Sequence, residues 1–388
     1  MLVLFQRMTP IKLKEKKGTV DWLTYLAALG LCGLGLVTMN SFAGHDPIFI
    51  KQLIWLIVGT LVYFGASQID WRFLRNTGVA TTLFGVLVLP LIFLVVLGHA
   101  VKGAKSWISF GGIGVEPIEF VKLALIVLLA KYFSRRHIEI RNIRHIFVSG
   151  LYAGLVFVLV ALQPDLGGAI IVGLIWFGMV LFSGISRKHF ISVIVLGTVA
   201  FSAMWFFGFH DYQKQRIMTF INPKHDIYGT GYNVYQSTIA VGSGGVLGKG
   251  IGYGTQSKLR FLPEYQTDFI FAAYAEEWGF VGIILVFTLY GTIFWGLLRT
   301  ATKGATNFET LFTIGVLCYL AAHFALHVGI NMGVLPVTGT TIPFMSYGGS
   351  HILAEFLALG MVAGMAAYAR AGTRQSMDRE FDGGYSQI

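Results

Sequence analysis

Residues 79–98, VATTLFGVLVLPLIFLVVLG, run for 20 positions without a charged side chain. About 20 apolar residues in a helix are enough to cross the hydrocarbon core of a bilayer, which is about 30 Å thick. Lipid offers the backbone no hydrogen bonds, so a segment that crosses it must satisfy its own N–H and C=O groups. The run is too long for a barrel strand and therefore predicts a transmembrane α-helix.

The rest of the chain has the same character. Of its 388 residues, 55% are hydrophobic and only 12% are charged, whereas a soluble domain has about 25% charged residues. The sequence predicts an all-α polytopic integral membrane protein with about ten transmembrane helices. The ten predicted spans are 21–43, 48–68, 79–98, 118–134, 145–163, 168–184, 190–209, 270–298, 309–330 and 351–370.

The formal charge of +10 is distributed by side of the membrane. With the N-terminus inside, about 19 of the 29 Lys and Arg residues fall in cytoplasmic segments, as the positive-inside rule requires. Both termini are therefore predicted to be cytoplasmic, and no nucleic-acid partner is needed to explain the charge. The predicted parts are a basic tail (1–20), one transmembrane domain (21–370) with a large extracytoplasmic loop (210–267) between helices 7 and 8, and a C-terminal tail (371–388).

Ionisable residues near the predicted outer side each have two interpretations. Asp268 opens the eighth span and is either a partly desolvated general base or a helix N-cap. Glu119 and Lys122 lie three residues apart at the start of the fourth span and predict an ion pair on one helix face, either in a polar cavity or purely structural. Asp165, in the turn before the sixth span, is either a helix cap or part of a site.

The long outer loop contains VGSGGVLGKGIGYGTQ (241–256) together with the cations Arg216 and Lys249. A Gly-rich backbone beside a Lys can cradle phosphate, but the spacing fits neither a Walker A loop nor a dinucleotide fingerprint. The loop is either a solvated connection or a site for an anionic lipid headgroup. Glu276 and Glu277, two turns into the eighth span, are expected to be structural, with one of them paired to a cation or polar group.

Five stretches, taken together and in order, resemble one family of membrane enzymes. It is the SEDS family (shape, elongation, division, sporulation), the membrane glycosyltransferases that polymerise peptidoglycan. The start of the long loop is more similar to the RodA branch of the family than to FtsW, and the likeness extends over nearly the whole chain. The stretches are QPDLGGA (163–169), HDYQKQRI (210–217), GTGYNVYQSTIAVGSGGVLGKG (229–250), GTQSKLRFLPEYQTDFIFAAYAEEWG (254–279) and PVTGTTIPFMSYGGS (336–350).

The resemblance implies roles for particular residues. The catalytic aspartate of the family falls on Asp268, within PEYQTDF. The chain departs from the usual QPSE at Glu116 and Ile118, and it has Gln266 where His is usual, which removes a titratable group beside Asp268. The implied substrate-binding positions are Glu119, Lys122, Asp165, Arg216, Lys249, Ser346 and Gly348.

The activity that the resemblance implies is glycan-strand extension from lipid II at the outer face of the cytoplasmic (inner) membrane. Asp268 would take the proton of the acceptor sugar's 4-hydroxyl, whose oxygen attacks the anomeric carbon of the undecaprenyl-pyrophosphate-linked strand with inversion. The expected partners are a class B penicillin-binding protein, which is a transpeptidase, and other elongation-complex proteins. The resemblance names no required cofactor, and a divalent metal, Mg²⁺ or Mn²⁺, stays open.

Two other functions fit the composition. A flippase or transporter for lipid II predicts acidic residues along a path through the middle of the membrane. A non-catalytic scaffold of the wall-synthesis machinery would tolerate the loss of Asp268. The candidate acids lie near the outer mouth of their spans, which favours the enzyme.

The topology predicts opposite labelling of two engineered cysteines. One placed near Lys224, in the long outer loop, should react with a membrane-impermeant thiol reagent added from outside, because it lies on the outer side of the bilayer. One placed near Arg141 should not react, because the bilayer shields it. The reverse pattern would invert the topology and move the candidate site to the cytoplasm.

Overall fold

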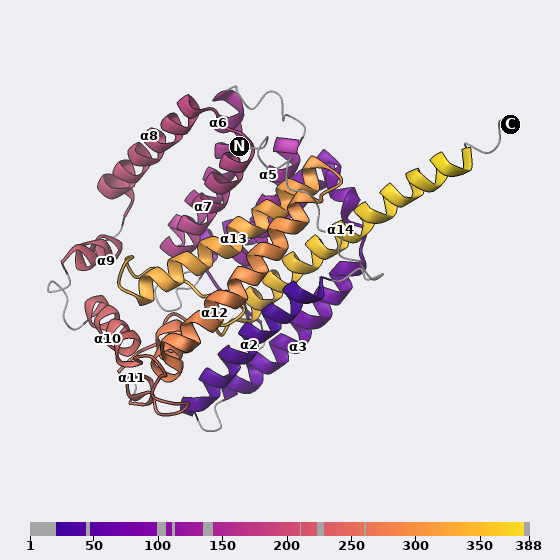
Figure 1. Ribbon diagram of the computed structural model, residues 1–388. Coiled ribbons are helices and arrows are strands. Elements are labelled where there is room, and N and C mark those ends of the chain that lie inside the picture. Colours follow the sequence, from indigo (N-terminus) through magenta and orange to yellow (C-terminus); the bar gives the residue numbers. More distant parts are fainter. Residues whose placement is uncertain are drawn as a thin grey trace.

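The computed structural model describes residues 21–383 apart from 44–46, 99–105, 111–112, 135–142, 210, 223–228 and 260. Its helices form one bundle (Figure 1), and a short antiparallel hairpin of β1 (Ile108–Phe110) and β2 (Ile113–Val115) precedes α5. The helices are α2 (Trp22–Ala43), α3 (Pro47–Gln68), the 3₁₀-helix η1 (Trp71–Arg75), α4 (Thr77–Leu97), α5 (Pro117–Ser134), α6 (Ile143–Leu162), α7 (Leu166–Phe182), α8 (Arg187–Ala203), the π-helical turn η2 (Met204–Gly208), α9 (Asp211–Ile221), α10 (Thr230–Ser243), α11 (Thr255–Lys258), α12 (Ile270–Thr302), α13 (Asn307–Asn331) and α14 (Gly349–Gly383).

Each of the ten predicted spans coincides with a helix. Eight helices of the described chain are long and apolar enough to cross a bilayer. The helices at the other two predicted spans are α7 and α5. Helix α7 is apolar but has 17 residues, and α5 carries three charged side chains, Glu119, Lys122 and Lys131, within 18 residues. The helical, polytopic membrane fold is confirmed, while the number of crossings and their orientation remain predictions. Helix α14 continues to Gly383, so part of the predicted C-terminal tail is helical.

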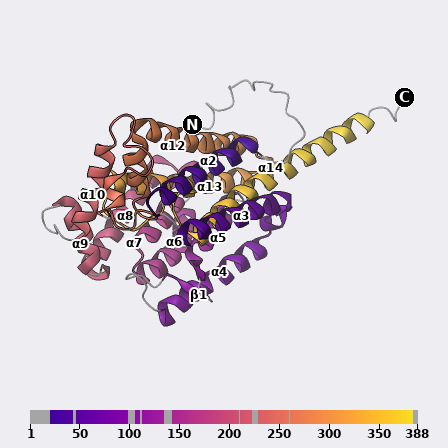
Figure 2. The same ribbon diagram turned by 90° about the horizontal axis from the view of Figure 1, so that it is seen from below.

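Helices α13 and α14 are the most deeply buried of the eight candidate spans. Helix α13 lies among α5, α7, α12 and α14, and it packs against all four (Figures 1 and 2). Helix α8 lies at the edge of the bundle, where most of its side chains are exposed. An apolar outer surface is expected where lipid tails replace water, so the exposed apolar side chains of α8 need no further explanation. The buried polar side chains of α13 and α14 do need one, because burial removes them from water.

The predicted long loop, 210–267, is not a structureless connection. It contains α9, α10 and α11, which lie at the end of the bundle away from the C-terminus (Figure 1). Helix α10 packs against α12 and α13, and Ser237 of α10 donates a hydrogen bond to the backbone oxygen of Asn331 at the end of α13 (2.7 Å). The loop is thus built onto the same end of the bundle from which α12 begins.

Helix α12 is broken near its start. Gly279 has φ +62° and ψ −161°, a backbone conformation that glycine adopts without steric cost. The break frees backbone groups on both sides, and the Gly-rich loop supplies partners for them, as buried backbone groups in a membrane protein require. These bonds are Lys249 N–H to Glu276 O (3.0 Å), Gly250 N–H to Glu277 O (3.0 Å), Phe280 N–H to Gly245 O (2.9 Å) and Val281 N–H to Val246 O (3.1 Å).

Gly279→Ala should destabilise the protein. A Cβ at this position would lie 2.2 Å from the backbone nitrogen of Gly248, and a non-glycine residue in such a conformation costs about 1–3 kcal/mol before any clash is counted. Gly291→Ala, in the same helix and with nothing within 4 Å of its Cβ position, is the matched control and should be neutral or stabilising by up to about 1 kcal/mol. Equal unfolding temperatures for the two variants in one detergent would contradict the requirement for glycine at the break.

Candidate active site

Asp268 lies in the turn before α12, where its side chain is half-buried. The N-cap position of α12 is the next residue, Phe269, which makes no capping bond through its side chain. The capping bond comes instead from α13, where Asn331 Oδ1 accepts from Ala272 N–H (3.1 Å) and Asn331 Nδ2 donates to Asp268 O (3.0 Å). The side chain of Asn331 thus joins the turn of Asp268 to the first turn of α12.

The loop between α13 and α14 holds this turn from the other side. Ser346 Oγ donates to Thr267 O (2.8 Å), and Tyr347 N–H donates to Gln266 O (2.9 Å). Gln52 of α3 bonds the same loop, donating to Ser346 O (3.0 Å) and accepting from Gly348 N–H (3.3 Å). Of the two residues of this loop predicted as substrate contacts, Ser346 braces the backbone that carries Asp268, and Gly348 is bonded to Gln52.

The segment Thr338–Thr341 of this loop runs next to the Asp268 carboxylate. Gly339 has φ +74°, and a Cβ built on it would lie 3.6 Å from Asp268 Oδ2. On its other side the segment meets the start of α7, because a Cβ on Gly167 would lie 2.6 Å from Thr340 Cγ2. Only glycine gives this φ without strain, and it also leaves the carboxylate close to bare backbone.

The predicted ion pair between Glu119 and Lys122 is present inside the bundle. Lys122 Nζ lies 2.7 Å from Glu119 Oε1, and both side chains are almost completely buried. Further bonds compensate for the lost water: Tyr319 OH donates to Glu119 Oε2 (2.9 Å), and Lys122 Nζ lies 2.9 Å from His323 Nε2. A buried pair is tolerated only with such additional hydrogen bonds.

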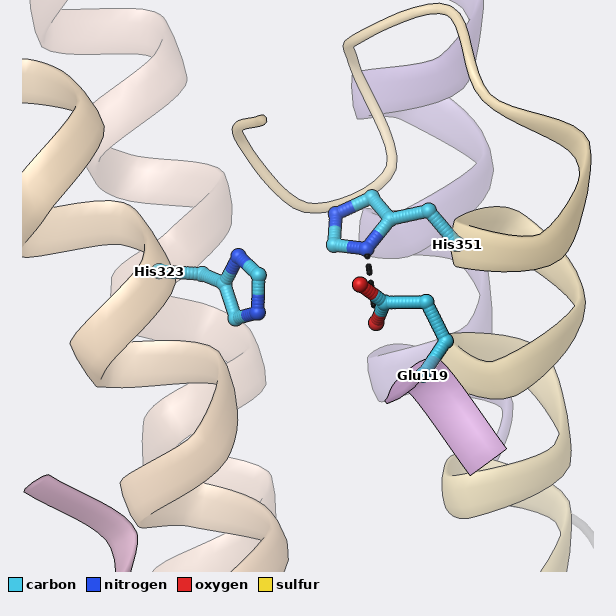
Figure 3. A group of neighbouring side chains, drawn as sticks. All are labelled: Glu119, His323 and His351. Atoms are coloured by element: carbon cyan, nitrogen blue, oxygen red, sulfur yellow. Dashed lines mark hydrogen bonds and ion pairs between the residues drawn. The ribbon is translucent and has the colours of Figure 1, made fainter. Parts of the chain in front are cut away.

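Helix α14 adds two more ionisable groups to this pair. His351 Nδ1 lies 3.2 Å from Glu119 Oε2, and His351 Nε2 lies 2.8 Å from Glu355 Oε1. Figure 3 shows Glu119, His323 and His351 converging from α5, α13 and α14. Our interpretation of the sequence did not include His351 or Glu355, although an ionisable residue inside a membrane span is a signal in itself.

Glu119, His323 and His351 also form the one group of potential metal ligands found among the described residues, with ligand atoms within 4.8 Å of one another. Lys122 Nζ already takes the lone pairs of Glu119 Oε1 and His323 Nε2, and its ammonium would repel a dication. Mg²⁺ and Mn²⁺ moreover favour oxygen ligands over imidazole. The group as arranged does not fit a resident Mg²⁺ or Mn²⁺, and Lys122 supplies its positive charge.

Asp165 caps α7 by accepting from Gly168 N–H (2.8 Å), which confirms the capping role. Burial raises the pKa of its carboxyl, while Lys122 and Arg216 oppose that shift through their charges. Burial and the charges of Glu119 and Asp165 likewise raise the pKa of the Glu116 carboxyl, to about 8. Asp165 and Glu116 are therefore influenced by the charges of the buried ion pair, and Arg216 acts on Asp165.

Lys249 is placed elsewhere, at the break of α12. Its Nζ lies 2.7 Å from Glu276 Oε1, which also accepts from Thr255 N–H (2.9 Å) and Gln256 N–H (3.2 Å). This confirms the expectation that one of Glu276 and Glu277 is paired to a cation or polar group. The backbone N–H groups of Lys249 and Gly250 are bonded to α12, and that of Gly248 is bonded to Gly244 O, so they are not arranged as a preformed phosphate cradle. The side chain of Lys249 stays 28% exposed, and its contact with substrate remains a prediction.

These features define a polytopic membrane protein with a half-buried carboxylate at one end of the bundle and a charged network behind it. A family model described as "Cell cycle protein" (FtsW, RodA, SpoVE) matches residues 20–371, and the chain belongs to this family. Stage V sporulation protein E of Bacillus subtilis (strain 168) is 32% identical over 368 residues, which cover 92% of this chain and 99% of that protein. Peptidoglycan glycosyltransferase MrdB of Escherichia coli (strain K12) is 34% identical over 343 residues, which cover 87% and 90%.

Solved structures agree with this assignment. A chain from a structure described as "Structural coordination of polymerization and crosslinking by a peptidoglycan synthase complex" superposes with a TM-score of 0.76 at 31% identity, covering 90% of this chain and 98% of that one. The Rod shape determining protein RodA of Thermus thermophilus superposes with a TM-score of 0.67 at 28% identity, covering 90% and 97%. The resemblance to the SEDS family is therefore confirmed along nearly the whole chain.

Lys122→Met should destabilise the protein and impair glycan polymerisation. Removing one partner of a buried ion pair typically costs about 3–5 kcal/mol, because the other charge is left uncompensated. The double variant Glu119→Gln, Lys122→Met removes both charges and should recover part of the lost stability. Thermal unfolding of the three proteins, with polymerisation per mole of folded protein, measures both effects. If Lys122→Met unfolds and polymerises as the unaltered protein does, the pair is idle.

Proposed function

We propose that this chain is a peptidoglycan glycosyltransferase that extends glycan strands from lipid II, with Asp268 as its general base. The observation that carries the base assignment is the placement of Asp268. Its carboxylate is half-buried, and its backbone is held by Asn331 of α13 in a turn that Ser346 also braces. A base at the edge of an apolar bundle is partly desolvated, which strengthens it. Relatives named peptidoglycan glycosyltransferase MrdB and FtsW support the same activity.

The proposed reaction needs one base. Asp268 takes the proton of the acceptor sugar's 4-hydroxyl, and the oxygen forms a bond to the anomeric carbon of the donor strand. The bond from that carbon to the pyrophosphate breaks, and undecaprenyl pyrophosphate leaves with the electron pair. An α-linked donor gives a β-linkage by this single displacement, so no covalent glycosyl-enzyme is required. An inverting transfer of this kind uses a carboxylate as base rather than as nucleophile.

The leaving group carries negative charge, and two cationic side chains are candidates to stabilise that charge. Arg216 on α9 acts electrostatically on Asp165, at the same end of the bundle as the turn of Asp268. Lys249 is partly exposed and bound to Glu276, so it would have to share its charge with the substrate. The buried Glu119, His323 and His351 group does not fit Mg²⁺ or Mn²⁺. A divalent metal at the pyrophosphate would therefore need other ligands, and it stays a prediction.

The biological setting follows from the family. The structure described as a peptidoglycan synthase complex joins polymerisation to crosslinking, which supports a crosslinking partner, here proposed as a class B penicillin-binding protein. We place the chain in the cytoplasmic (inner) membrane, with the turn of Asp268 facing outward. The role in cell elongation rather than division, and the association with other elongation-complex proteins, rest on the similarity of the long loop to RodA.

A flippase and a scaffold remain the competing functions. The buried ionisable residues of α5, α13 and α14 are consistent with a polar path, as a flippase requires, but they bond to one another. A scaffold needs no carboxylate in a braced turn. Purified protein separates the three, because only the enzyme converts lipid II into glycan strands without a second polymerase.

Asp268→Asn should abolish most polymerisation while leaving the fold intact. A general base contributes typically about 10²–10⁴-fold in rate, and the amide keeps the size of the side chain while removing its basicity. The backbone bond from Asn331 to Asp268 O does not depend on the carboxylate. The measurement is glycan-strand formation from labelled lipid II per mole of folded protein, with and without the transpeptidase partner.

Glu264→Gln is the matched control for this prediction. Glu264 lies in the same turn, four residues before Asp268, and its side chain is exposed. It should therefore lose little activity, although the chemical change is the same acid-to-amide replacement. Near-normal polymerisation by Asp268→Asn would refute the assignment of the base, and an equal loss in both variants would point to the turn rather than to the carboxylate.

A further inference from the structure

Three polar side chains form a stripe along one face of the buried helix α13. His323, His327 and Asn331 are spaced by four residues, which places them on the same side of a helix. Each is at most 2% exposed. Polar groups removed from water in a membrane helix are costly and call for an explanation. Of the three, only His323 takes part in the network of Glu119 and Lys122.

His327 donates to the segment beside Asp268. Its Nδ1 lies 2.8 Å from Thr340 O, and a carbonyl oxygen only accepts, so the proton must be on Nδ1. Within the described part of the chain, His327 Nε2 has no hydrogen-bond partner. The one hydrogen bond that the ring makes there is therefore the bond to Thr340, and it supplies a donor for a carbonyl oxygen inside the bundle.

His323 likewise donates a hydrogen bond to the segment, at Thr341, the residue after Thr340. It also connects two parts of the site. Its Nδ1 lies 3.2 Å from Thr341 O, and its Nε2 lies 2.9 Å from Lys122 Nζ. Since the ammonium can only donate, Nε2 accepts and Nδ1 carries the proton. The ring thus bridges the buried ion pair and the backbone of the segment.

Asn331 completes the stripe at the catalytic end. It bonds Asp268 O and Ala272 N–H. The histidines bond Thr340 and Thr341. Gly339, which precedes Thr340, faces Asp268 Oδ2. One helix face therefore holds both sides of the contact between the carboxylate and the segment. An error of about 1 Å in the placement of a catalytic group can cost about 10²-fold in rate.

We propose that His323, His327 and Asn331 are positioning residues, which set the Thr338–Thr341 segment against Asp268 and so fix where the base meets the acceptor sugar. This inference rests on the proposed role of Asp268. It also explains how the Glu119–Lys122 pair acts on the reaction: the pair holds His323, and His323 holds the segment. The stripe touches the protein backbone and Lys122 rather than the reacting atoms.

The test compares two amides at position 327. The amide nitrogen of Asn occupies nearly the position of Nδ1 in His, whereas that of Gln corresponds to Nε2. His327→Asn should keep the bond to Thr340 O and stay within about threefold of the unaltered rate, while His327→Gln should lose it and fall by about 10–10²-fold in kcat. KM for lipid II should change much less than kcat, since the segment is expected to orient the base and not to bind the lipid. Unfolding temperatures are measured for both variants.

Two results would overturn the inference. One is equal polymerisation by His327→Asn and His327→Gln, whether both retain or both lose activity. The other is a loss in His327→Gln that follows its unfolding temperature and is restored when the assay is run on folded protein at lower temperature. Asp268→Asn, assayed in parallel, tests the base separately: if it polymerises normally while His327→Gln does not, the stripe holds some other group and the inference is also wrong.

Discussion

Away from water, a polar group needs another part of the protein to replace the solvent, and the whole bundle depends on this constraint. An unsatisfied buried donor or acceptor costs about 1–3 kcal/mol. Helix α12 can break at Gly279 because the Gly-rich loop bonds the freed backbone groups. Glu276 can be fully buried because Lys249, Thr255 and Gln256 all donate to it. Irregular backbone at membrane depth is tolerated only where such partners exist.

The same constraint ties an irregular loop to the helices around it. The stretch 336–348 has no regular secondary structure, yet helices on three sides bond its backbone. Gln52 of α3 donates to Ser346 O, His327 of α13 to Thr340 O, and Phe344 N–H donates to Glu355 of α14 (2.8 Å). Sites carried by such supported backbone keep their geometry better than sites on free loops. A half-buried carboxylate placed beside this loop therefore has a defined position without being part of a helix.

The two lysines that were predicted as substrate contacts differ in how their charge is held. Lys122 is 1% exposed and lies between Glu119 and His323, so its charge is committed to the interior network. Lys249 is 28% exposed, and its partner Glu276 is held by backbone N–H groups as well. A partly exposed ammonium can exchange partners at small cost, whereas moving a fully buried one would leave two groups unsatisfied. The two lysines, which are the same residue type in the sequence, thus differ in how readily each could bind a substrate.

From the sequence alone, the long apolar helices and several residues of the site could be predicted. The length of apolar runs predicted a helix at each of the ten positions where one is found, and spacing of three residues predicted the Glu119–Lys122 pair, because both depend only on near neighbours along the chain. The position of Asp268 at a span boundary also marked it as a candidate. The joining of Glu119 to His323 and His351, 204 and 232 residues away in sequence, was not predictable. Helical periodicity tells which side chains share a face, but only packing decides which faces meet, and so which buried charges and carbonyl oxygens become partners.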